Sequence, residues 1–157
     1  MYEHLLVALD GSPAAERVLE HATALATAFG SQVTLLRATL SAEMVIAQSG
    51  AGDATVGQVG SPGLDPQPVL EADHATATQY LEEVAVRLRQ QNLNVSLEAV
   101  DGPANTVIID RAAQLGVGLI LMTTHGRSGL GRMVFGSTAD SVLRHSACPV
   151  LLVRITE

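Results

Sequence analysis

Lysine is absent from this chain of 157 residues, in which all nine basic residues are arginine. The absence excludes a Walker-type phosphate-binding lysine, a Schiff-base lysine and the lysine expected beside a receiver-domain aspartate. Tryptophan is also absent and aromatic residues make up only 3% of the chain, so the stacking platforms of single-strand nucleic acid binders are missing. The arginines are scattered and the net charge is −7. We therefore expect no nucleic-acid partner.

Cysteine and long apolar runs are equally scarce. The single Cys148 permits no internal disulfide, which fits a reducing compartment. Met1 leads almost directly into a short apolar run without a basic region or a cleavage site, so no signal peptide is predicted. No run approaches the roughly 18 apolar residues of a membrane-spanning helix. The sequence predicts a cytoplasmic protein with no membrane partner, and its isolated histidines predict no metal site.

The apolar residues, 47% of the chain, are arranged in short runs that alternate with stretches of helical spacing. Five runs lack the alternation of a half-exposed strand and are typical of strands covered on both faces; they span residues 4–10, 32–38, 94–100, 117–122 and 149–155. Helical spacing occupies residues 13–29, 69–91, 103–115 and 137–145. This order predicts one α/β domain over residues 1–157, with a five-stranded parallel sheet and helices on both faces.

Two helix starts have recognisable signals. Ser12 and Pro13 follow Asp10-Gly11, which predicts Ser12 as the N-cap and Pro13 as the first helical residue. Gly30 supplies the stop of that helix. The spacing from Ser137 to Asp140 matches a capping box, so the last helix is expected to begin at Ser137.

Residues 41–68 interrupt the alternation of apolar runs and helical stretches. They hold five glycines and three prolines, and their apolar residues show neither helical nor strand spacing. They predict a long surface loop with a short helical piece at residues 43–48. Loops of this length are lids, binding loops or disordered segments, and the sequence leaves these alternatives open.

Ligands of parallel α/β sheets bind beyond the carboxyl ends of the strands, which directs attention to Asp10 and to the segment after Met122. Residues 123–138 read TTHGRSGLGRMVFGST and pass from a buried strand to a helix. Glycine is needed where φ is positive or where a ligand approaches the backbone closely. The glycines of this segment and the free amides at the start of the helix together predict a phosphate site. Arg127 and Arg132 would add charge-assisted hydrogen bonds to it. The glycines of the segment are Gly126, Gly129, Gly131 and Gly136.

This segment resembles the nucleotide loop of the universal stress proteins, which is written Gly-two-Gly-nine-Gly-Ser/Thr. Gly126, nine further residues, Gly136 and Ser137 match its last elements, whereas Thr123 occupies the position of the first glycine. The resemblance extends over VALDGS near the start, GPA before the third helix, LILMTTHGRSG, and GSTADSVLRHSACPVLLV near the end. Only residues 41–66, a variable loop in the family, lack a counterpart.

The resemblance implies a Rossmann-like sheet with strand order 3-2-1-4-5, and ATP or AMP as the ligand, with Mg²⁺ as an accompanying ion. It implies adenine near Ala8 and Ala38, and Asp10 near the adenosine end. The ribose and first phosphate would lie over Thr123 and Gly126, and the outer phosphates over the start of the last helix. The complete set of predicted nucleotide-binding residues is Ala8, Leu9, Asp10, Ala38, Met122, Thr123, Gly126, Arg127, Gly129, Gly136, Ser137 and Thr138.

Thr123 leaves two alternatives open, since some family members bind no nucleotide. Its side chain could crowd the ribose or donate a hydrogen bond, and a β-branched residue fits poorly if φ is positive there. We expect a sensor or regulator with at most slow ATP hydrolysis and no catalytic residues, because no nucleophile and base are paired. The alternative is a nucleotide-free member that acts through protein contacts. The resemblance further implies a homodimer through residues 149–155, which form an edge strand.

Overall fold

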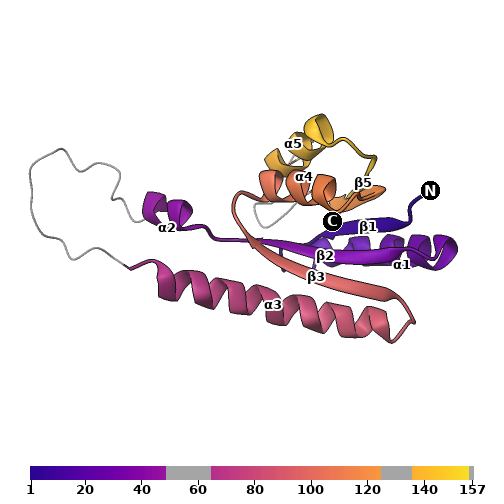
Figure 1. The fold of residues 1–157 in the computed structure, drawn as a ribbon, viewed down its shortest axis with the longest axis horizontal. Coiled ribbons are helices and arrows are strands. Elements are labelled where there is room, and N and C mark those ends of the chain that lie inside the picture. Colours follow the sequence, from indigo (N-terminus) through magenta and orange to yellow (C-terminus); the bar gives the residue numbers. More distant parts are fainter. Residues whose placement is uncertain (49–64, 125–135, 156–157) are drawn as a thin grey trace, which may run out of the picture.

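A computed structural model describes residues 1–48, 65–124 and 136–155 of the chain. Its strands form one five-stranded sheet in the order β3-β2-β1-β4-β5, and all four neighbouring pairs are parallel (Figure 1). The predicted strand order is therefore confirmed. The strands are β1 (His4–Ala8), β2 (Gln32–Thr39), β3 (Asn94–Asp101), β4 (Leu119–Thr123) and β5 (Val150–Val153).

Helices cover both faces of the sheet, as the buried strands require. On one face α1 and α3 pack over Leu5 and Val7, and on the other α4 and α5 pack over Leu6. These three neighbours in β1 are all fully buried, which is why the strand has no polar alternation. The helices are a 3-10 turn η1 (Ala15–Arg17), α1 (Val18–Phe29), α2 (Ala42–Gln48), α3 (Gln67–Arg89), α4 (Ala104–Gln114) and α5 (Ser137–His145).

The start of the first helix differs from the prediction. Asp10 accepts a hydrogen bond from the Ser12 N–H at 2.9 Å, and the Ser12 hydroxyl accepts one from the Ala15 N–H at 3.1 Å. The two bonds hold the turn that leads into η1. The helix α1 begins only at Val18, and its N-cap residue is Arg17 rather than the predicted Ser12. Gly30 ends α1 with φ of 66°, as predicted.

The bounds of α5 agree with the predicted residues 137–145, but the predicted capping box is wrong. Gly136 is the N-cap residue and no side chain caps the helix. Asp140 instead accepts a hydrogen bond from Arg144 Nε at 2.9 Å, the i,i+4 pairing that helices favour. The first amides of α5 are therefore not claimed by a capping side chain.

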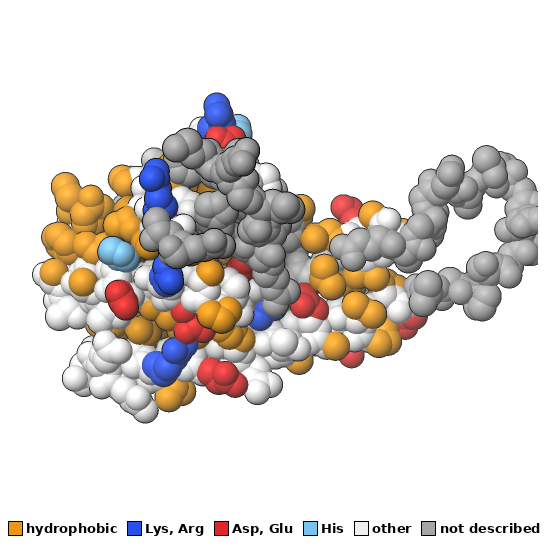
Figure 2. All heavy atoms as spheres, turned by 180° about the vertical axis from the view of Figure 1, so that it is seen from behind, with side chains coloured by type: hydrophobic (Ala, Val, Ile, Leu, Met, Phe, Trp, Pro, Cys, Tyr) orange, Lys and Arg blue, Asp and Glu red, His pale blue; other side chains and the backbone are white. Residues whose placement is uncertain are grey.

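Two segments extend beyond the sheet and form an arm (Figure 1). The arm consists of α2, which confirms the short helix predicted at residues 43–48, and the first half of the 23-residue α3. Figure 2 shows hydrophobic side chains on this arm, where Ile46 and Val69 each leave 49% of their surface exposed. Most of the predicted long loop, residues 49–64, lies outside the described residues. None of the helices described here is both long and apolar enough to cross a membrane.

Candidate functional site

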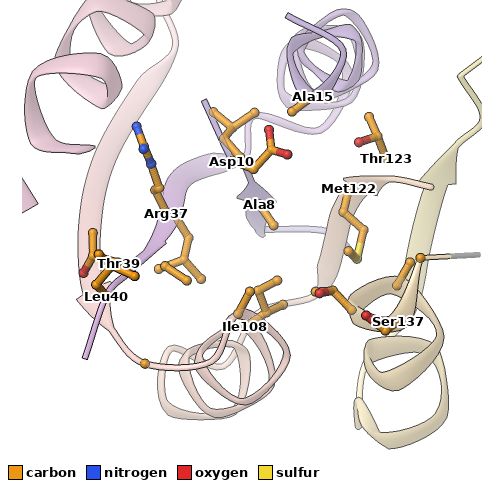
Figure 3. Close-up of a pocket in the computed structure, with 18 of the residues that line it drawn as sticks. Ala8, Asp10, Ala15, Arg37, Thr39, Leu40, Ile108, Met122, Thr123 and Ser137 are labelled. Atoms are coloured by element: carbon orange, nitrogen blue, oxygen red, sulfur yellow. The ribbon is translucent and has the colours of Figure 1, made fainter. Parts of the chain in front are cut away.

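A cavity of about 440 Å³ lies at the carboxyl ends of β1, β2 and β4 (Figure 3). Strand order explains its position, because β1 lies between β2 and β4 and the chain turns away after each of these strands. The cavity brings together nine of the twelve residues predicted to bind nucleotide: Ala8, Leu9, Asp10, Ala38, Met122, Thr123, Gly136, Ser137 and Thr138. Gly126, Arg127 and Gly129 lie outside the described residues. The role of all twelve in binding stays a prediction.

At one end of the cavity β2 continues past its neighbour β1. Pairing of β1 with β2 ends at Ala8 opposite Leu36, and the Leu9 N–H then donates to the Leu36 carbonyl at 2.9 Å. In this register the N–H and C=O of Ala38 point to the same side as the Leu36 carbonyl. Because the pairing with β1 ends at Leu36, neither group has a partner in β1, and no other described residue forms a hydrogen bond with them. The strand therefore presents one donor and one acceptor to the cavity from a single residue.

At the other end of the cavity α5 begins. The Gly136 N–H donates to the Thr124 carbonyl at 3.0 Å, which fastens the helix start to the end of β4. The amides of the first turn, beginning at Ser137, have no acceptor within the helix and carry the positive end of its dipole. Gly136 has φ of −52°, so positive φ does not explain the glycine. A Cβ there would lie 3.3 Å from the Thr124 carbonyl oxygen, a tight contact that favours glycine at this position.

Thr123, the residue that departs from the family motif, is the last residue of β4 and pairs with Val153. Among the described residues other than glycine, only Tyr2 and Asn92 have positive φ. Thr123 is thus in the extended conformation that β-branched residues favour. The strained alternative considered for this position is wrong, and its side chain stands in the cavity wall (Figure 3).

Several polar residues of the wall were not predicted. Thr39 donates from its hydroxyl to Asp101 at 2.6 Å, and Asp73 accepts from the Leu40 N–H at 2.8 Å. Arg37 is buried in β2 and lines the same cavity. In the sequence, Arg37 could have been noticed as a single charged residue inside an apolar strand. Asp73 lies on an ordinary polar face of a helix, and nothing in the sequence distinguishes it.

The described part of the wall has little capacity for covalent chemistry. It contains neither histidine nor cysteine, so no side chain there pairs a nucleophile with an imidazole base. Within residues 1–48, 65–124 and 136–155, no three His, Cys, Asp or Glu side chains gather as a metal site would require. The wall instead offers hydrogen-bonding groups and apolar side chains, which suit binding.

A model of the universal stress protein family matches residues 1–154. The chain belongs to this family. Universal stress protein A homolog 2 of Coxiella burnetii is 31% identical over 156 residues, covering 98% of this chain and 96% of that protein. The universal stress protein UspA from Lactobacillus plantarum is similar in structure, with a TM-score of 0.78, 24% identity and 98% coverage of both chains. That likeness supports the fold.

Two further universal stress protein structures are described with ligands. One is in complex with cAMP and matches with a TM-score of 0.68 at 19% identity, covering 98% of this chain and 97% of that chain. The other, from Arabidopsis thaliana, has AMP bound and matches with a TM-score of 0.60 at 13% identity, covering 98% and 92%. Adenine nucleotides are therefore ligands within this family of structures.

Proposed function

We propose that this universal stress protein binds ATP or AMP in the cavity and acts as a sensor or regulator of the stress response. The proposal rests on two sets of backbone groups at opposite ends of one cavity, which have no hydrogen-bond partner among the described residues. Ala38 offers a donor and an acceptor at the β2 end, and the start of α5 offers amides at the β4 end. The bound AMP and cAMP of the two family structures agree with this ligand class.

Adenine suits the β2 end. Its N1 accepts a hydrogen bond and its amino group donates one, so a neighbouring N–H and C=O of the same residue, here Ala38, complement that edge. The rings would lie between the apolar side chains of Ala8, Ile108 and Met122, all of which line the cavity. Base recognition by backbone groups needs no particular side chain, which is why composition gives no signal of it.

Phosphate suits the β4 end. Helix N-termini bind anions because their first amides lack internal partners and the helix dipole favours negative charge. Because Gly136 is the N-cap residue and no side chain caps α5, these amides are available to a ligand. The sheet order β2-β1-β4 then sets the sequence of groups along the cavity, with the base near β2, the ribose over β1 and Asp10, and the phosphates near β4 and α5.

The only reaction that we propose is slow hydrolysis of bound ATP, with Mg²⁺ accompanying the triphosphate. The remaining parts of the proposal are a single domain, a cytoplasmic location and a homodimer through residues 149–155. The observed position of β5 at a sheet edge supports the dimer, because an unpaired apolar edge strand favours pairing with a second copy.

Calorimetric titration of the protein with ATP, with and without Mg²⁺, and with AMP tests the binding proposal after any retained nucleotide has been removed. We expect saturable binding of an adenine nucleotide at or below millimolar concentration. Mass spectrometry of the protein as purified supplies an independent readout of a retained ligand. A flat titration at millimolar ligand, with no adenine nucleotide in the purified sample, would favour the nucleotide-free alternative.

A further inference from the structure

Arg37 is a buried cation without a counter-ion in the described structure. It leaves 6% of its surface exposed, and its guanidinium carbon lies 5.6 Å from the centroid of the Tyr80 ring. No described residue accepts a hydrogen bond from the guanidinium or forms an ion pair with it. Burying a charge is costly unless it is paired, and an aromatic face replaces only part of the lost hydration. An anion would accept hydrogen bonds from the five N–H donors of this group and balance its charge.

The Arg37 side chain belongs to one particular wall of the cavity. In β2 the side chains of Val33 and Leu35 pack with α1 and α3, whereas those of Leu36 and Ala38 pack with α4 and α5. Arg37 continues the first series, which agrees with its contact to Tyr80 of α3. Figure 3 shows Arg37 and Asp10 on the same side of the sheet edge, opposite Ile108 and Ser137.

This wall faces the part of the ligand that lies over β1. In the proposed binding mode, on which this inference rests, the ribose spans the gap between the base at Ala38 and the phosphate at α5. Asp10 stands at the end of β1 and can accept hydrogen bonds from ribose hydroxyls. Arg37 comes from the adjacent strand β2 and lies on the same side of the sheet as Asp10. A group attached to one of those hydroxyls would therefore lie near the Arg37 guanidinium.

We infer that Arg37 binds a second phosphate carried on a ribose hydroxyl, so that the ligands of this site include adenosine 3′,5′- or 2′,5′-bisphosphate and molecules built on them. A phosphate monoester carries the charge that Arg37 lacks, and its oxygens match the planar fork of a guanidinium. Arg37 is the only basic residue in the described wall, where it stands with the acidic Asp10 and Asp73. Asp10 already accepts the Ser12 N–H, which offsets part of its repulsion of a phosphate.

Titration of the full chain with AMP and with each of the two bisphosphates tests this inference. Wild-type protein is expected to bind at least one bisphosphate about tenfold or more tightly than AMP, as a charge-assisted bidentate pair allows. In Arg37→Met the ratio falls to about one while AMP affinity changes less than about threefold. In Arg37→Lys, which keeps the charge but loses the fork, the ratio is intermediate.

Arg89→Met is the matched control, because Arg89 pairs with Glu82 on the exposed side of α3. We expect it to keep the wild-type ratio. A purely structural role of Arg37 would lower the affinity for all three ligands alike and would overturn the inference. So would bisphosphates that bind wild-type protein no tighter than AMP, a result that needs no variant and leaves the proposed function intact. If no adenine nucleotide binds at all, the proposed function fails and this inference fails with it.

Discussion

The Gly136 amide donates to the Thr124 carbonyl at 3.0 Å, and a Cβ on Gly136 would stand 3.3 Å from that same oxygen. The contact joins the start of α5 to the end of β4 and thereby positions the amides proposed to bind phosphate. Sequence reasoning attributed this glycine to positive φ or to a close approach of the ligand. The structure shows that φ is negative and that the protein's own backbone approaches this position closely, while the approach of a ligand stays a prediction.

Gly136→Val should weaken nucleotide binding by about tenfold or more, because the added side chain must displace the helix start or the Thr124 carbonyl. We expect a loss of about 1–3 kcal/mol in the free energy of unfolding, as for other overpacked sites. Calorimetric titration and urea denaturation measure the two effects. Ala113→Val, on an exposed position of α4, is the control and should leave ATP affinity unchanged. Undiminished affinity in Gly136→Val would remove α5 from the binding site.

Thr123→Gly restores the family motif but should not improve binding. Thr123 lies in a strand without positive φ, so glycine gains no conformational advantage there and raises the entropy lost on folding. The variant should lose about 1 kcal/mol of stability and change its affinity for ATP less than about threefold. Thr123→Val, which keeps the β-branched shape without the hydroxyl, separates packing from hydrogen bonding. A tenfold gain in affinity for Thr123→Gly would instead identify the side chain as an obstruction.

Base recognition through Ala38 predicts selectivity between AMP and IMP. IMP carries a donor at N1 and an acceptor at the sixth position, the reverse of adenine, so it mismatches the donor and acceptor of the strand. We expect AMP to bind about tenfold or more tightly than IMP in matched titrations, since mismatched polar groups lose their hydrogen bonds on burial. Equal affinities would show that the Ala38 backbone does not read the base.

Tyr80 predicts a loss of stability in alkali. Burial, followed by the negative charges of Glu16 and Asp10, raises the pKa of Tyr80 above its ordinary value of 10.0. Above pH 10 the unfolded chain therefore loses this proton while the folded chain keeps it, so the free energy of unfolding falls as pH rises, by at most about 1.4 kcal/mol per pH unit. Denaturation between pH 9 and 11 should show a shallower decline for Tyr80→Phe than for wild type. Parallel declines would contradict the assignment.

Much of the fold was predictable because local and global signals agree. The apolar run around Leu6 has no alternation since α1 and α3 cover one face and α4 the other, and the helix at residues 137–145 has a clear apolar spacing. The cap predictions failed because hydrogen bonds compete, as Asp140 prefers Arg144 to the helix start. Arg37 was missed as a site residue because its proximity to Tyr80, 43 positions away in sequence, arises only from packing.

The edge strand β5 gives the homodimer proposal a test at the level of single backbone groups. The Pro149 carbonyl accepts a hydrogen bond from the Ile120 N–H of β4, and the Val153 carbonyl accepts one from Thr124, the residue after β4. The backbone groups of the odd-numbered residues of β5 therefore face β4, and those of Val150 face outward. Val150→Pro therefore removes an outward N–H without breaking the sheet, and it should convert a dimer to a monomer.

Val150→Ala keeps that N–H and should remain a dimer, which makes it the matched control for lost side-chain packing. Light scattering at micromolar concentration distinguishes the states, with wild type and Val150→Ala expected at twice the 16.3 kDa chain mass and Val150→Pro at the chain mass. A wild-type protein that scatters as a monomer would contradict the dimer. If Val150→Pro is still a dimer, the dimer contact does not involve the β5 backbone, because a strand without that donor cannot pair regularly with a second copy.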